Sequence, residues 1–161
     1  MYRSIEELIK QAKEQEIPLW QVVLNMEMHI TETTKEEIYE KLDKRYEVMY
    51  RCVHKALQQP QQTAGNLISG VAGSQEKYSR RQDTICGSLI NHVMALALSA
   101  SEVNAAMGKI CAAPTAGSCG ILPAVLIGVS QYYEYPKEVI LRGLLTASGV
   151  GTVVVRNATV S

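Results

Sequence analysis

A proline- and glycine-rich stretch, residues 111–123, carries the residue types best suited to chemistry in this chain. Pro114 fixes one backbone torsion and pushes the preceding residue into an extended conformation. Gly117 and Gly120 can adopt a positive φ at no steric cost. Pro123 suits the first position of a helix, where its missing N–H group costs nothing. The pattern predicts a shaped turn that leads into the start of a helix.

This turn holds two hydroxyls, those of Thr115 and Ser118, and no charged side chain. The free N–H groups of a helix start favour an anion, so the turn is a candidate anion-binding site. A second interpretation explains the same residues: a buried helix–helix connection whose hydroxyls cap backbone groups. The residue types alone leave both interpretations open.

The four cysteines are Cys52, Cys86, Cys111 and Cys119. None belongs to a CxxC pair, and their spacing matches no zinc-binding pattern. The charged start of the chain is no secretory signal, which predicts reduced thiols and a cytoplasmic location. A thiol at the helix start would have a lowered pKa, so Cys119 is also a candidate nucleophile, but no histidine is placed to assist it.

The charges balance, with 16 basic and 16 acidic side chains, and this excludes an overall attraction to nucleic acid or to a membrane surface. Of these 32 charges, 20 lie in residues 1–60 and seven in residues 91–161, which predicts a solvated first part and a buried last part. Residues 110–130 have no charge, but their prolines and glycines rule out a lipid-facing span. We therefore expect no nucleic acid and no membrane among the partners.

Capping boxes predict the first helices. Ser4-x-x-Glu7 begins a helix that runs to about residue 14, and Pro18 begins the next. Thr33-x-x-Glu36 precedes a long amphipathic helix that ends near residue 58. On this helix we expect His54 to face solvent.

Residues 59–84 interrupt these patterns with glycines and glutamines and predict a linker or irregular loop. Residues 85–107 predict a buried helix, on which His92 is interpreted as a hydrogen-bonded core histidine rather than a general base. Glu102 and Asn104 interrupt the apolar end of this helix and must find partners there. Two more apolar helices follow, over 122–133 and from Pro136 to about residue 150.

The predicted class is all-α, a bundle of roughly six to seven helices with a buried, Pro/Gly-bent loop. We divide it into charged amphipathic helices (1–58), an irregular linker (59–84) and an apolar helical core (85–161). The core ends in an apolar, β-branched run from Val153 to Ser161 that has no cap. We therefore expect the chain to be cut short at residue 161, inside a larger catalytic domain.

The run Glu102-Val103-Asn104-Ala105-Ala106-Met107-Gly108-Lys109-Ile110-Cys111-Ala112-Ala113-Pro114-Thr115-Ala116-Gly117-Ser118-Cys119-Gly120 closely resembles the α subunit of bacterial iron–sulfur L-serine dehydratase. The final Asn157-Ala158-Thr159-Val160-Ser161 is similar to that family's Asn-Ala-Ser-Ile-Ser segment. Residues 5–9 and 25–27 also resemble the start of the family, so the resemblance spans nearly the whole chain.

The resemblance implies a lyase of amino-acid catabolism and gluconeogenesis that converts L-serine to pyruvate and ammonia. A 4Fe–4S cluster held by three cysteines would act as a Lewis acid on the substrate hydroxyl while a base removes the α-proton. The family's cluster cysteines follow the Asn-Ala-Ser segment, so we expect them beyond residue 161 and assign no metal to Cys111 or Cys119. We expect no cofactor in these residues and an inactive isolated chain. The resemblance also implies that a β subunit or domain completes the enzyme and that the enzyme is an oligomer.

Within this enzyme we predict that the chain supplies the loop that binds the carboxylate of L-serine. The substrate-binding residues would be Thr115, Ser118 and Gly117, with Asn104 bracing the loop or the substrate. Asn157 and Ser161 are weaker candidates for the same site. No residue is assigned as the base. The alternative function is a helical scaffold or interaction domain with no chemistry of its own.

Overall fold

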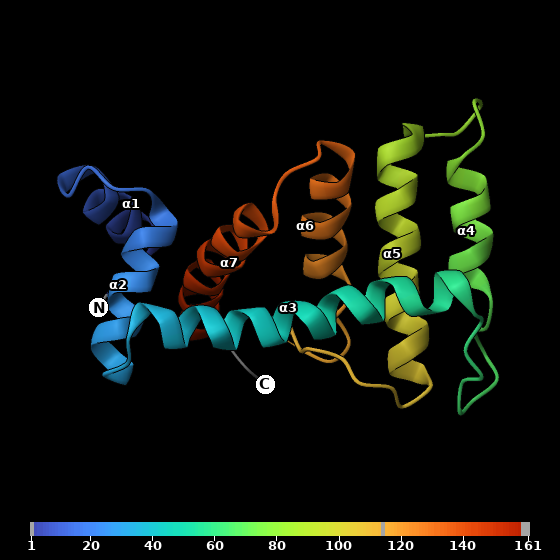
Figure 1. The fold of residues 1–161 in the computed structure, drawn as a ribbon, viewed down its shortest axis with the longest axis horizontal. Coiled ribbons are helices and arrows are strands. Elements are labelled where there is room, and N and C mark those ends of the chain that lie inside the picture. The colour runs from blue at the N-terminus through green and yellow to red at the C-terminus, as the bar shows by residue number, and fades with distance from the viewer. Residues whose placement is uncertain (1, 114, 159–161) are drawn as a thin grey trace. The chain divides into compact units, whose positions relative to one another are not determined.

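The computed structural model describes residues 2–113 and 115–158, and within these residues it contains seven α-helices and no strand (Figure 1). The helices are α1 (Ile5–Glu14), α2 (Leu19–Thr31), α3 (Lys35–Gln58), α4 (Val71–Ser79), α5 (Gly87–Ala105), α6 (Ile121–Tyr132) and α7 (Lys137–Asn157). The prediction of an all-α chain is confirmed.

The chain folds into two compact units. The first combines residues 1–43 with residues 138–161, and the second consists of residues 44–137. Helix α3 contributes its first part to one unit and the remainder to the other. The division at residues 58 and 84 stays a prediction.

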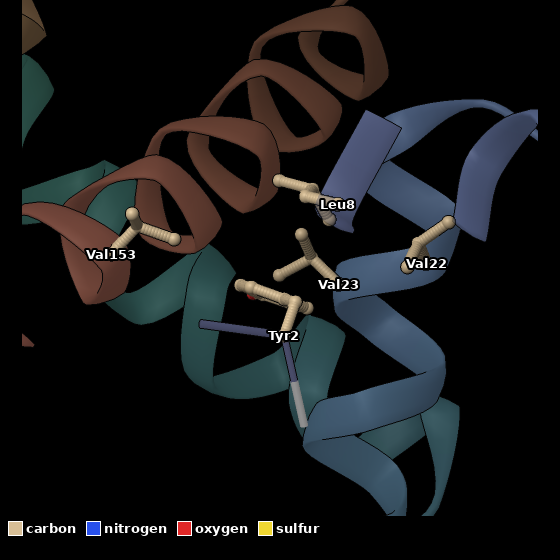
Figure 2. Close-up of a cluster of buried hydrophobic side chains, with 5 residues drawn as sticks. All are labelled: Tyr2, Leu8, Val22, Val23 and Val153. Atoms are coloured by element: carbon tan, nitrogen blue, oxygen red, sulfur yellow. The ribbon is translucent and has the colours of Figure 1, made fainter. Parts of the chain in front are cut away.

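The first unit is built around a small cluster of buried side chains from α1, α2, α7 and the residues before α1 (Figure 2). Its members are Tyr2, Leu8, Val22, Val23 and Val153. Burying side chains of this size stabilises the unit by about 1.5–3 kcal/mol for each valine or leucine.

Helix α7 is longer than predicted and continues through two glycines to Asn157. A Cβ on Gly149 would collide with the Val23 side chain and lie 3.0 Å from the Tyr2 hydroxyl. Gly149 therefore allows α7 to approach α2 closely, so this glycine does not end the helix. The valine run after it is helical, because packing against the cluster outweighs its β-branched character.

Local signals set the starts of α1 and α3. The Ser4 hydroxyl accepts a hydrogen bond from the Glu7 N–H group, as predicted. The second capping box is displaced by one residue from its predicted place. It joins Thr34 and Glu37, whose side chains each accept a bond from the other's N–H group.

The second unit contains a helix that the sequence did not predict. Helix α4 lies inside residues 59–84, so the expectation of an irregular segment there is wrong over residues 71–79. The chain enters α4 through Gly70, whose φ of 73° suits glycine. The N–H groups of Gly70 and Ala72 donate to the carboxylate of Glu102 on α5, which therefore caps α4.

Helix α5 packs against both α4 and α6 (Figure 1). Its contact with α6 depends on two glycines that have no side chain. A Cβ on Gly120 would lie 2.7 Å from the Ala97 carbonyl oxygen, and a Cβ on Gly128 would lie 2.8 Å from the Val93 side chain. Gly120 has a φ of −87°, so it does not use the positive φ that glycine permits. It is a glycine because two backbones meet there.

Of the helices in the described residues, α7 is the one with the length and apolar composition needed to cross a membrane. A third of its most apolar window is buried within the protein. A core helix meets the same criterion, so the expectation of no membrane partner stays a prediction.

Candidate functional site

The turn before α6 is closed by two hydroxyls that cap each other's backbone. The Thr115 N–H group donates to Ser118 Oγ and the Ser118 N–H group donates to Thr115 Oγ1, both at 3.3 Å. The two hydroxyl oxygens are 3.0 Å apart, and the Ser118 hydroxyl also reaches the Ala113 carbonyl at 3.2 Å. This is the capping role of the second interpretation, and it gives the turn a defined shape.

The same turn is exposed, which corrects the prediction of a buried loop. Thr115 and Gly117 are exposed and Ser118 is half-buried, whereas Cys119 and Gly120 are buried. The Thr115 and Ser118 hydroxyls bond within the turn although the turn is exposed. Burial begins where the chain joins α6 and Gly120 contacts α5.

Asn104 braces this turn from the last part of α5. Its side-chain amide Nδ2 donates to the Ala116 carbonyl at 3.1 Å. The structure therefore brings Asn104, Thr115 and Ser118 together, and their role in binding the substrate stays a prediction. Gly117 lies in the same turn, where an added Cβ would be 3.9 Å from Thr115 Oγ1, so its glycine is not demanded by space.

Two residues before Asn104, the side chain of Glu102 is fully buried. Its carboxylate accepts bonds from the N–H groups of Ala72 at 2.8 Å, Gly70 at 3.1 Å and Gln61 at 3.4 Å. The hydrogen-bond partners of Glu102 are thus backbone N–H groups of residues 61–72, a segment distant in sequence. The end of α5 therefore positions both the 61–72 segment and the 113–118 turn.

The remaining candidates lie elsewhere in the chain. The Asn157 side chain donates to the carbonyls of Val153 and Arg3, at 2.8 and 3.1 Å, in the first unit. Ser161 lies outside the described residues. Their assignment to the substrate site stays a prediction.

Two of the four thiols, those of Cys52 and Cys119, do not suit nucleophilic catalysis. Burial, with smaller contributions from Cys119 and Cys111, raises the pKa of Cys52 to about 12, and the Cys52 thiol donates to the Met49 carbonyl. Burial also raises the pKa of Cys119, so the expected lowering at the helix start is wrong. The desolvation of this buried thiol outweighs the effect of the helix end.

His92 has the hydrogen bonds expected of a core histidine, although its side chain is only partly buried. Its Nδ1 lies 2.8 Å from Glu76 Oε2 on α4, and its Nε2 lies 3.4 Å from Gln131 Oε1 on α6. His54 was expected to face solvent, but its Nε2 contacts the Gln131 amide nitrogen at 3.0 Å. Sequence reasoning missed Glu76 and Gln131, because nothing local marks their meeting.

We expect Glu76 to make stability depend on pH. Burial opposes ionisation of this carboxyl, but hydrogen bonds from His92 and Arg80 outweigh it and lower the pKa of Glu76 below 4.5. The unfolded chain therefore binds the proton more readily. The stabilisation is present above pH 4.5 and is lost as the pH falls through the folded pKa. Urea unfolding from pH 3 to 7 should show this loss, and Glu76→Gln should remove it. An unchanged pH profile in Glu76→Gln would contradict the assignment.

The helices and the braced Thr115–Ser118 turn define an all-α protein with a polar, exposed loop at a helix start. Comparison with known proteins identifies its family. The sequence pattern of the serine dehydratase alpha chain matches residues 14–161. The chain belongs to the serine dehydratase alpha chain family.

Three relatives illustrate the similarity. The chain is 40% identical to the L-serine dehydratase alpha chain of Peptoniphilus asaccharolyticus over 159 residues, 99% of this chain and 54% of the relative. It is 39% identical to the probable L-serine dehydratase alpha chain of Bacillus subtilis over 161 residues, 100% of this chain and 53% of the relative. It is 30% identical to L-serine dehydratase 2 of Escherichia coli over 168 residues, 99% of this chain and 36% of the relative. The chain thus spans about half the length of the Peptoniphilus asaccharolyticus and Bacillus subtilis relatives.

Proposed function

We propose that this chain is part of an enzyme that converts L-serine to pyruvate and ammonia. Membership of the serine dehydratase alpha chain family supports the activity and the substrate. The word "alpha" in the names of the first two relatives supports a second, β subunit or domain. A cytoplasmic location and an oligomeric enzyme belong to the same proposal, and so does a role in L-serine catabolism.

The chain's own part in this reaction is to receive the carboxylate of L-serine at the turn before α6. The observation that carries this step is the reciprocally capped pair of exposed Thr115 and half-buried Ser118, in a turn that Asn104 braces. The Thr115 hydroxyl can turn its hydrogen from Ser118 toward a bound carboxylate. The N–H groups of a helix start favour the same negative charge. Asn157 and Ser161 are included as further contacts.

We expect Thr115→Val and Ser118→Ala to weaken the binding of L-serine in the complete enzyme. A hydrogen bond to a charged group contributes about 1.5–3 kcal/mol, so KM should rise by about 10- to 100-fold with a smaller change in kcat. Steady-state kinetics measure this split. Thr115→Ser keeps the hydroxyl and should restore KM.

Ser101→Ala is the matched control, because the exposed Ser101 hydroxyl donates to the Ala97 carbonyl within its own helix, α5. It should leave KM unchanged. Unaltered KM and kcat in both Thr115→Val and Ser118→Ala would overturn the assignment of the loop.

The described residues do not fit an iron–sulfur cluster. They contain no group of three or more His, Cys, Asp or Glu side chains arranged to hold a metal. Cys52 is buried with its proton engaged, and Cys86 is exposed and distant in sequence from the turn. We therefore propose that the 4Fe–4S cluster of the complete enzyme takes its ligands from outside these residues.

A helical scaffold without chemistry is the second candidate. The observation in its favour is a set of exposed apolar side chains on α5 and α6, comprising Ile90, Met94, Ile121 and Val125. Activity of the complete enzyme separates the two candidates. If the chain is a scaffold, the complete enzyme should keep full activity in the Thr115→Val variant. Activity should then fall only in variants that prevent assembly of the enzyme.

A further inference from the structure

Helices α4, α5 and α6 of the second unit lie side by side as a layer, and residues 44–58 of α3 cross one face of this layer (Figure 1). The side chain of Ser99 joins α5 to α3. Its hydroxyl accepts a bond from the Ala56 N–H group and donates one to the Cys52 carbonyl oxygen. One face of the layer is therefore covered within the unit, and the other face decides what further contacts the unit can make.

Helices α5 and α6 each carry a stripe of exposed apolar side chains. Ile90 and Met94 on α5 are 49% and 47% exposed, and Ile121 and Val125 on α6 are 64% and 44% exposed. The two members of each pair are four residues apart, so they lie one above the other on the surface of their helix. We call the surface formed by Ile90, Met94, Ile121 and Val125 the α5–α6 face.

Two close contacts show that α5 and α6 run antiparallel. A Cβ added at Gly120, just before α6, would lie 3.0 Å from the Cβ of Ala100 in the last part of α5. A Cβ added at Gly128, further along α6, would lie 2.8 Å from the side chain of Val93, earlier on α5. These four residues mark the line along which the two helices touch.

The α5–α6 face lies on the side of this contact line that is turned away from α3. Each residue of an α-helix is rotated by about 100° from the residue before it. Met94 follows the contact residue Val93, and Ile121 likewise follows Gly120. Both stripes are therefore one step ahead of the contact line, and in antiparallel helices this step leads to the same side. Ser99, one step behind the contact line, bonds to α3 and lies on the opposite side.

The composition of the α5–α6 face is that of a permanent contact. Residues 121–129 of α6 are all apolar, and a helix that is apolar all round is normally buried. The cores of protein interfaces are depleted of charged residues, and permanent interfaces resemble the core of a domain divided in two. The face therefore suits a polypeptide that stays attached to it.

The family indicates which polypeptide this is. The chain covers 54% and 53% of the alpha chains of Peptoniphilus asaccharolyticus and Bacillus subtilis, so nearly half of each relative lies outside the matched part. We propose that the equivalent remaining half of the complete alpha chain packs on the α5–α6 face as a further layer of the same domain. The identity of this occupant rests on the proposed function.

The proposed contact also reaches the candidate site. Ile121 comes three residues after Ser118, so a segment that buries Ile121 lies beside the Thr115–Ser118 turn. The turn is exposed within the described residues. The remaining half of the alpha chain therefore supplies the opposite wall of the carboxylate site.

Photo-cross-linking in the complete enzyme identifies the occupant. Val125→p-benzoylphenylalanine places the probe on the α5–α6 face, and peptide mass spectrometry locates its adduct. We expect adducts with the part of the alpha chain outside residues 1–161. Adducts with residues 1–161 of a second copy, adducts with a β subunit, or no protein adduct would each overturn the proposal.

The matched control places the same probe at Lys55, an exposed residue of α3 on the covered side of the layer. Lys55→p-benzoylphenylalanine should not capture the peptides that the probe at position 125 captures. Capture of the same peptides from both positions would overturn the assignment of the contact to the α5–α6 face.

A charge on the α5–α6 face should matter only where the face is covered. Met94→Lys keeps an unbranched side chain and adds a charge, and Met94→Leu is the apolar control. In the 161-residue chain the two variants should unfold at the same urea concentration, because Met94 is exposed there. In the complete alpha chain Met94→Lys should unfold at about 1 M less urea than Met94→Leu, since the charge is buried. Equal midpoints in the complete alpha chain would overturn the proposal.

These measurements report contact and stability rather than catalysis, so the two proposals can fail separately. If only the proposed function is wrong, the cross-link forms and Thr115→Val leaves KM unchanged. If only the contact is wrong, Thr115→Val raises KM and the cross-link is absent.

Discussion

Glu102→Ala is expected to lower the free energy of unfolding by about 3–5 kcal/mol. The side chain is 0% exposed, and its carboxylate accepts bonds from three backbone N–H groups. Removing it leaves the N–H groups of Gly70 and Ala72 without their partner at a cost of about 1–3 kcal/mol each. Urea unfolding measures the change.

The conservative substitution separates charge from shape. Glu102→Gln keeps the volume but turns an NH₂ group toward backbone donors, so we expect a loss of about 1–3 kcal/mol. Glu36→Gln makes the same chemical change at an exposed position on α3 and should cost less than about 0.5 kcal/mol. Equal losses of unfolding free energy in Glu102→Gln and Glu36→Gln would contradict a stabilising role of the Glu102 carboxylate.

The loss of Glu102 should also reach the candidate site. Asn104 follows Glu102 on α5 and holds the Ala116 carbonyl of the Thr115–Ser118 turn. The bonds between Glu102 and the N–H groups of Gly70 and Ala72 also hold the end of α5 against the start of α4. If the end of α5 frays when these bonds are lost, the turn loses its brace. We therefore expect KM for L-serine to rise in the Glu102→Ala enzyme before unfolding begins, whereas a purely global effect would lower active enzyme concentration and leave KM unchanged.

Gly120→Ala is expected to destabilise the protein by about 1–3 kcal/mol. The new Cβ would lie 2.7 Å from the Ala97 carbonyl oxygen and 3.0 Å from Ala100 Cβ. Neither neighbour is the end of a flexible side chain, so α5 and α6 must separate. Thermal and urea unfolding measure the loss.

Gly151→Ala is the matched control, because an added Cβ there meets nothing within 4 Å. Gly151 lies inside α7, where alanine is the better helix former by about 0.5–1 kcal/mol. We expect this variant to be stabilised. Two alanine substitutions of opposite sign would show that close approach, rather than helix propensity, requires glycine at position 120. A neutral Gly120→Ala would contradict the packing of α6 on α5.

Much of the fold was predictable because its signals are local. The Ser4 cap lies three residues from its partner, and apolar spacing sets the helix that follows. The second capping box was predicted at Thr33 and Glu36 but lies at Thr34 and Glu37, which fit the same pattern equally well. Pattern alone cannot choose between adjacent threonines.

Helix α4 was not predictable for a physical reason. Its composition is poor for a helix, with two glycines at or near its start. Its N-terminus is capped by Glu102, which is 30 residues away from Ala72. A cap supplied from another helix leaves no signature in the capped segment.

The family was determined by the sequence by itself, through the run around Asn104 and Pro114, and so was the all-α class, through periodicity and caps. The tertiary structure decided that the Thr115–Ser118 turn is exposed, that Gly120 serves close packing, and that His54 and His92 share Gln131. Periodicity and capping act between neighbours in the chain, whereas exposure and side-chain pairing depend on which helices meet. Residues 54, 92 and 131 come together only when α3, α5 and α6 have packed.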